Sequence, residues 1–236
     1  MILMDMGEVL MCMCSLRQRR VVLLGLAGVM IMPQQLWAQN DGIDVIGGAV
    51  NIKPSSSAEG RKQPFKLDSG ALGGVVKTKD QVFYLDPETE ADFYKEDDGL
   101  VSNIVLKAGG VLSLFGEKSG QGVEIKTFNA VGAIRGTTTY FAWQAKEKRT
   151  YVCCCYGGVD LLNGKGGQKS LETSYHTAVV LPQDGGVEPA PYDRPLNHYD
   201  DDILALEGQV GRTPRWQLPH GQMNFFAPRP VPLKSG

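Results

Sequence analysis

Residues 150–162 read TYVCCCYGGVDLL, a run of β-favouring residues that the pair Gly157-Gly158 interrupts. Aromatic and β-branched residues are typical of strands, and a two-glycine link suits a tight hairpin turn because both residues can adopt positive φ. The stretch therefore predicts two short strands joined by a turn. Because side chains alternate along a strand, Cys153 and Cys155 would lie on one face and Cys154 on the other.

Short apolar runs broken by glycine continue over residues 71–182. The candidate strands lie at 72–78, 81–85, 101–106, 111–115, 123–127, 130–134, 137–144, 150–156, 159–162 and 177–181. Strands at a spacing near ten residues, with almost no helical periodicity, predict an all-β fold, an antiparallel β-sandwich or roll of about ten short strands.

The segments on either side of this region differ from it in composition. Residues 39–70 are polar and rich in Gly, Ser and Asn, which favours a flexible lead-in. Residues 183–236 predict a linker, one short helix over 201–211 and a Pro-rich tail. The helix follows three aspartates that suit its N-terminus, and Gly211 is a natural terminator.

The N-terminus predicts export. Arg17-Gln18-Arg19-Arg20 precedes twelve uncharged residues, and Pro33 and Ala38 follow, which is typical of a signal peptide over residues 1–38. Arg19-Arg20 also resembles a twin-arginine signal, with an ordinary basic region as the alternative. Translation from Met11 or Met13 is a further alternative. The apolar run is shorter than a membrane span of about 20 residues, so we expect no stable span in the mature form.

Composition excludes several classes of protein. The chain has 236 residues, of which 42% are hydrophobic and 21% charged, and its net charge is −2. It is too apolar for a disordered chain. A nucleic-acid partner is not expected, because a protein that neutralises phosphates normally carries a basic excess.

The segment Ile134-Arg135-Gly136-Thr137 lies between two candidate strands, after the glycine pair Gly109-Gly110 and before Gly158-Val159. In this context the chain resembles the FecR domain, the periplasmic part of iron-dicitrate-type signal regulators, over roughly residues 70–182. The resemblance implies a periplasmic domain that takes part in signal transduction by binding an envelope protein or another cell-envelope component. About twenty residues precede the apolar run, too few for an anti-sigma segment, so a stand-alone exported form is expected.

On this reading the binding surface surrounds Arg135, Gly136, Thr137 and Tyr140, because loops on a rigid β scaffold usually carry recognition. The alternative for Arg135-Gly136-Thr137 is a structural bulge in which a buried arginine finds an acidic partner.

The three adjacent cysteines give a second functional hypothesis. Cys153 and Cys155 could join His176 or His198 around copper or zinc, which would make the protein a metal- or redox-active envelope protein. The alternative is that these cysteines are small buried strand residues.

Motifs of known catalytic sites are absent from the sequence. The segment 164–170 ends in Gln-Lys-Ser where a phosphate loop needs Gly-Lys-Ser, so it predicts a solvated turn. The run His198-Tyr199-Asp200-Asp201-Asp202 could hold a divalent cation, but its aspartates are also what the start of a helix requires. We therefore expect a non-enzymatic protein without a cofactor, the copper or zinc site being the alternative.

Overall fold

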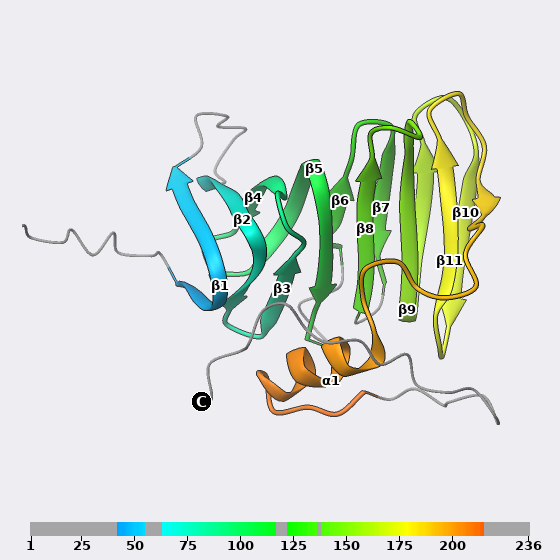
Figure 1. The fold of residues 1–236 in the computed structure, drawn as a ribbon. Helices are drawn as coiled ribbons and strands as arrows, with labels where there is room; N and C mark the ends of the chain where they lie inside the picture. Colours follow the sequence, from blue (N-terminus) through cyan, green and yellow to red (C-terminus); the bar gives the residue numbers. More distant parts are fainter. Residues whose placement is uncertain (1–41, 55–62, 117–121, 136–137, 215–236) are drawn as a thin grey trace, which may run out of the picture. The chain divides into compact units, whose positions relative to one another are not determined.

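The computed structural model describes residues 42–54, 63–116, 122–135 and 138–214 (Figure 1). These belong to one compact unit, Gln39–Gly236. The elements in chain order are β1 (Ile43–Pro54), β2 (Gln63–Thr78), β3 (Gln81–Leu85), β4 (Glu90–Lys95), β5 (Val101–Leu114), β6 (Glu124–Lys126), β7 (Ala130–Ile134), β8 (Thr138–Gln144), β9 (Arg149–Asn163), β10 (Gln168–Thr173), β11 (Thr177–Pro182), β12 (Glu188–Pro189) and α1 (Asp200–Gly208).

The strands form one continuous sheet that is folded into two layers. Three long strands, β2, β5 and β9, take part in both layers, because different parts of each strand pair with different neighbours. The fourth long strand, β1, takes part in both layers because it pairs with both halves of β2. Layer A contains β4, β6, β7 and β10, and layer B contains β3, β8, β11 and β12. All described strand pairs are antiparallel except β5–β6. The all-β fold with one short C-terminal helix is thus confirmed.

Glycines with positive φ mark the points where the long strands pass from one layer to the other. Gly109 has φ 75° in β5, and Gly157 has φ 95° in β9. The expected hairpin turn at Gly157-Gly158 is therefore wrong, because β9 continues through it. Four strands, β1, β2, β5 and β9, are longer than the short strands that the sequence predicted, and the others are short. A left-handed glycine serves a bend within a strand as well as a turn.

The core between the layers is built from apolar side chains. Phe83 of layer B packs edge-to-face on Phe93 of layer A, with ring centroids 5.0 Å apart, and on Phe115 at 5.8 Å. The residues that fill this space are fully buried aromatic and aliphatic side chains, among them Leu67, Leu85, Ile104, Phe141 and Val152.

A second apolar cluster lies on the outer face of layer B. The segment 190–199, which we call the strap, and α1 cover this face (Figure 1). Ile203 and Leu206 of α1 are fully buried there, whereas Leu204 is exposed. The expected helix at 201–211 is found at Asp200–Gly208, and Asp202 accepts a hydrogen bond from the Tyr199 N–H at 3.0 Å across its first turn.

The structure changes one predicted segment, the lead-in, and does not describe two others. The expected lead-in at 39–70 instead contains β1 and the first part of β2, which pair with each other. Polar and glycine-rich composition did not prevent pairing, because the alternate residues Leu67 and Phe65 still face the core. The predicted signal peptide at 1–38 and the tail from 215 onward lie outside the described residues.

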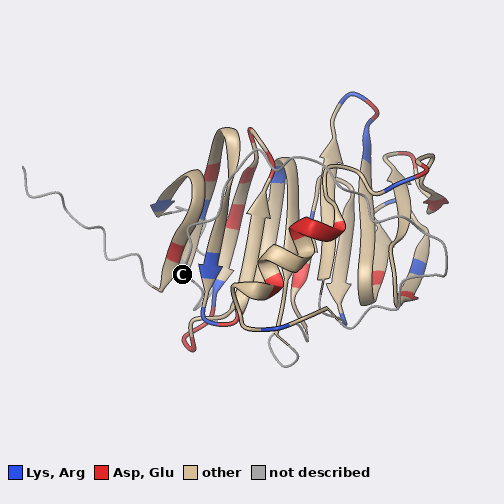
Figure 2. Ribbon diagram, turned by 60° about the horizontal axis from the view of Figure 1, so that its bottom comes forward, with Lys and Arg blue, Asp and Glu red and all other residues tan. Residues whose placement is uncertain are grey.

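In the part of the chain that the structure describes, no helix has the length and apolar character needed to cross a membrane. Figure 2 shows Lys and Arg intermixed with Asp and Glu along the strands, and the run of aspartates at the first turn of α1.

Candidate functional site

Four metal-ligating side chains meet under the strap, on the outer face of layer B. They are Cys153, Cys155, His176 and His198, and the ligand atom that each offers lies within 4.8 Å of the other three. Two come from β9, one from the residue before β11 and one from the strap. The sequence proposed this set without fixing how the two histidines are placed, and the structure brings all four residues together.

Local strand geometry places three of these groups. Alternation along β9 turns Cys153 and Cys155 outward and Cys154 into the core between the layers. The pairing of β11 with β9 sets Thr177 opposite Cys154, and the His176 N–H donates to the Cys155 carbonyl at 2.9 Å. His176 therefore lies immediately before β11, directly beside the two outward thiols.

The strap supplies the fourth group. The Leu196 N–H donates to the Tyr151 hydroxyl at 3.2 Å, and Asn197 adopts φ 55°, a left-handed conformation that asparagine tolerates better than most residues. The ring of His198 lies over that of Tyr140, with centroids 4.7 Å apart. These contacts hold the imidazole of His198 over Cys155.

Each histidine presents one nitrogen to a sulfur and is oriented through the other. Nδ1 of His176 lies 3.4 Å from Cys153 Sγ, and its Nε2 lies 3.0 Å from Asp200 Oδ1. Nε2 of His198 lies 3.3 Å from Cys155 Sγ, and its Nδ1 donates to the Leu196 carbonyl at 2.7 Å. A carboxylate or carbonyl behind a histidine is the usual support of a metal ligand.

The centre is enclosed, and its groups alter one another's ionisation. Cys153, Cys155 and His198 are fully buried. Burial opposes ionisation of Cys153, but hydrogen bonding from Cys155 and the nearby imidazoles hold the pKa of Cys153 well below its usual value. Burial and the neighbouring Cys153 raise the pKa of Cys155. Burial lowers the pKa of His176, but Asp200 and Cys153 outweigh it and raise that pKa to about 9.

Arg135 and Tyr140, the predicted binding residues that the structure describes, do not form a shared surface. Arg135 is half exposed; its Nε lies 2.7 Å from Asp160 Oδ2, and its backbone N–H donates to Gly158. The expected acidic partner is thus present, but the expected burial is not. Tyr140 is fully buried and donates to Asp86 beside the Cys/His centre. Gly136 and Thr137 lie outside the described residues.

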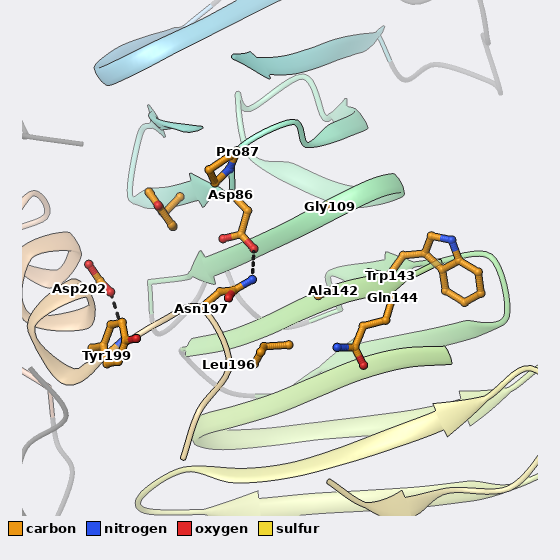
Figure 3. Close-up of a pocket in the computed structure, with 11 residues that line it drawn as sticks. Asp86, Pro87, Gly109, Ala142, Trp143, Gln144, Leu196, Asn197, Tyr199 and Asp202 are labelled. Atoms are coloured by element: carbon orange, nitrogen blue, oxygen red, sulfur yellow. Dashed lines mark hydrogen bonds between the residues drawn. The ribbon is translucent and has the colours of Figure 1, made fainter. Parts of the chain in front are cut away.

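A pocket of about 560 Å³ lies on the same outer face, between the ends of β3 and β8, the strap and the first turn of α1 (Figure 3). Its walls include Tyr84, Asp86, Trp143, Asn197 and Asp202. Asn197 Nδ2 donates to Asp86 Oδ2 at 3.0 Å and to the Tyr140 hydroxyl at 3.3 Å. This network separates the pocket from the Cys/His centre.

Sequence reasoning missed two of the residues that organise this region. No sequence motif marks Asp86, which is notable only for its position directly after a predicted strand and before Pro87. Asp200 was interpreted only as a helix-starting or cation-binding residue, whereas it is buried and contacts both His176 and the Tyr175 hydroxyl, the latter at 2.9 Å. Asp201 is exposed.

No family model matches the chain, and no curated protein matches it. Among solved structures, one similar chain is that of a protein from Parabacteroides distasonis ATCC 8503 described as "a putative anti-sigma factor", with 12% sequence identity and a TM-score of 0.45. The match covers 54% of this chain and 59% of that chain, so this chain spans less than two thirds of its neighbour's length.

Proposed function

We propose that the protein binds one transition-metal ion, Zn(II) or Cu(I), at the Cys153, Cys155, His176 and His198 centre. The observation that carries the proposal is the convergence of four buried ligand atoms, from three separate segments, within 4.8 Å of one another. Two sulfur and two imidazole donors suit zinc and copper, whereas magnesium and calcium take oxygen ligands.

The distances are compatible with a tetrahedral ion after a small contraction. Bonds of about 2.3 Å to sulfur and about 2.0 Å to nitrogen place neighbouring donors roughly 3.3–3.8 Å apart in a tetrahedron. The two sulfur–nitrogen separations of 3.3 and 3.4 Å already lie near this range. Any pair close to the 4.8 Å limit would shorten by about 1 Å on metal binding, which a small shift of the strap can supply for the pairs that include His198.

The arrangement favours a structural or carrier role for the ion. All four positions of a tetrahedral site are filled by protein groups, whereas a catalytic zinc keeps one position for water or substrate. The bound ion would join β9, the start of β11 and the strap, and so fasten α1 to layer B. An ion present at 100 times its dissociation constant would stabilise the fold by about 2.7 kcal/mol.

Cysteine substitutions along β9 test the proposal with a control in the same strand. Protein purified under reducing conditions and loaded with Zn(II) or Cu(I) is expected to retain about one ion per chain by elemental analysis. The Cys153→Ala/Cys155→Ala double variant should retain none, and Cys154→Ala, on the opposite face, should retain it fully. Equal metal content in the two variants, or none in the wild type, would reject the centre.

We further propose that the protein is an exported, stand-alone FecR-like domain that binds an envelope partner in the periplasm and has a signalling rather than a catalytic role. The sequence resemblance and the predicted signal peptide support it, and so does one exposed aromatic side chain. Phe128, 70% exposed, packs against Trp143 with centroids 5.3 Å apart. Exposed aromatic side chains of this kind are enriched among interface residues that dominate binding energy.

Two measurements test this second proposal. The N-terminal residue and the compartment of the mature protein should show cleavage near Ala38 and a periplasmic location. Cross-linking in periplasmic extract should then recover an envelope protein or glycan with the wild type and less with Phe128→Ala. A mature protein that still carries residues 1–38 and is found in the cytoplasm would refute export. Partner recovery that Phe128→Ala leaves unchanged would refute the aromatic surface.

A further inference from the structure

The pocket in Figure 3 has the size of a small-molecule site and the composition of a site for a positively charged ligand. Its volume of about 560 Å³ lies within the usual range of ligand pockets. Its lining includes two carboxylates, Asp86 and Asp202, and three aromatic side chains, Tyr84, Trp143 and Tyr199, and it includes no Lys or Arg.

Asp86 is the group that points to a ligand. Asp86 is only 6% exposed. Its carboxylate accepts two side-chain hydrogen bonds, and both come from neutral donors, the Tyr140 hydroxyl and the Asn197 amide. Both donors use Oδ2. Among the described residues, no Lys, Arg or His forms an ion pair with Asp86. A buried carboxylate without a cationic partner is costly, so a ligand cation would supply what the protein does not.

The second carboxylate adds to this imbalance of charge. Asp202 also lines the pocket, from the first turn of α1, and is close enough for its charge to disfavour ionisation of Asp86. Burial is the largest cause and raises the pKa of Asp86; the hydrogen bonds from Tyr140 and Asn197 and the nearby His198 oppose this rise, and Asp202 makes the smallest contribution to it. A cation between the two side chains would relieve both effects.

Aromatic rings complete the pocket. Tyr84 of β3 and Ala142 of β8 line the pocket from layer B. Trp143 stands at the far end of the pocket from Asp202 (Figure 3). A cation over a tryptophan or tyrosine face gains about 0.5–2 kcal/mol, more when it is desolvated. Aromatic faces also bind the methyl or methylene groups that an organic cation carries.

We propose that this pocket binds a small organic cation, a substituted ammonium, with its charge against Asp86 and its alkyl groups against Trp143 and Tyr84. The ligand would lie next to the Cys/His centre without contacting it, because Tyr140 and Asn197 stand between Asp86 and His198. The proposal is independent of metal binding.

A matched pair of ligands tests the charge. Choline and its neutral analogue 3,3-dimethylbutan-1-ol have nearly the same shape and differ in the quaternary nitrogen. Titration calorimetry on the full chain, at low ionic strength because exposed charges are screened by salt, is expected to show saturable choline binding. The neutral alcohol should bind at least about tenfold more weakly.

Variants identify the site. Asp86→Asn, which keeps the shape and one hydrogen-bond acceptor, should weaken choline binding at least about tenfold. Asp201→Asn removes an equal charge one residue before Asp202, outside the pocket lining, and should leave binding unchanged. Trp143→Leu should also weaken choline binding. Metal content of each variant, measured in parallel, shows whether any loss arises instead from damage to the Cys/His centre.

Three outcomes would overturn the proposal. The first is choline binding that is no stronger than binding of the neutral alcohol. The second is an equal loss of binding in Asp86→Asn and Asp201→Asn, which would assign the effect to general charge. Stronger binding of an uncharged oligosaccharide such as maltotriose would make the aromatic and polar lining a carbohydrate site instead.

Discussion

The two faces of layer B are buried in different ways. The inner face meets layer A through apolar side chains such as Phe83 and Val152. The outer face is equally buried by the strap and α1, but there His198, Asp200 and Asp202 lie among tyrosines and thiols. Buried apolar groups stabilise any compact fold, whereas buried polar groups are costly unless they are partnered. The inner face therefore maintains the fold, and the outer face holds the two proposed binding sites.

Three consecutive cysteines show the same contrast. Burial raises the pKa of Cys154, on the inner face, to about 12, which keeps its thiol protonated and unreactive. Cys153, one residue away on the outer face, is equally buried, but its polar neighbours lower its pKa. The neighbouring groups, rather than burial alone, decide which thiol can act as a ligand.

The largest expected effect is on the inner face. Phe93→Ala removes a ring that packs on both Phe65 and Phe83, and should lower the free energy of unfolding by about 3–5 kcal/mol. Denaturant titration of the metal-free protein measures it. Leu72→Ala, at a side chain that is 61% exposed, is the control and should change stability by no more than about 0.5 kcal/mol. Similar losses in both would contradict the assignment of the core.

A polar substitution on the outer face should affect the ion more than the fold. Asp200→Asn weakens the support behind His176 Nε2 and should reduce metal affinity about 10- to 100-fold. Competition with a chelator of known affinity measures it. Asp201→Asn, in the same turn but exposed, is the matched control. If both variants bind metal like the wild type, Asp200 does not position the ligand.

Asp86 predicts a pH dependence of stability. Its folded-state pKa is raised, so between the unfolded value of about 3.9 and the folded value only the unfolded chain releases the proton. The stability that Asp86 contributes is therefore present below pH 4 and is lost as the pH rises through the folded pKa. Relative to Asp86→Asn, the ligand-free wild type should be less stable at pH 8 than at pH 4. Parallel pH profiles would show that Asp86 is not the group responsible.

The smallest effect is expected at Arg135, although the sequence pattern drew attention to it. Its ion pair with Asp160 is about half exposed on both sides, and such pairs contribute roughly 0–1 kcal/mol. Arg135→Ala should therefore change the free energy of unfolding by no more than about 1 kcal/mol, and less in high salt. A loss above about 2 kcal/mol, measured in the same denaturant series, would restore the buried structural role that the sequence suggested.

The sequence pattern predicted those features of this protein that depend on residues close together in the chain. Alternation over 150–156 correctly assigned the faces of the three cysteines, and turn-rich apolar runs correctly gave the all-β fold. The glycine pair at 157–158 was predicted to form a hairpin turn but forms a bend within β9, because a glycine with positive φ occurs in both. The approach of His198 to Cys155 depends on the path of the strap across a layer that assembles from distant segments, which no local signal specifies.

The four strands that serve both layers also constrain how the molecule can open. An ordinary sandwich could in principle separate into its two sheets, but here β1, β2, β5 and β9 each run through both, so parting the layers requires breaking the ladders within them. Amide hydrogens of β4 and of β8 should therefore exchange with deuterium through one shared opening event, with nearly equal protection. The fold would unfold as a single cooperative unit.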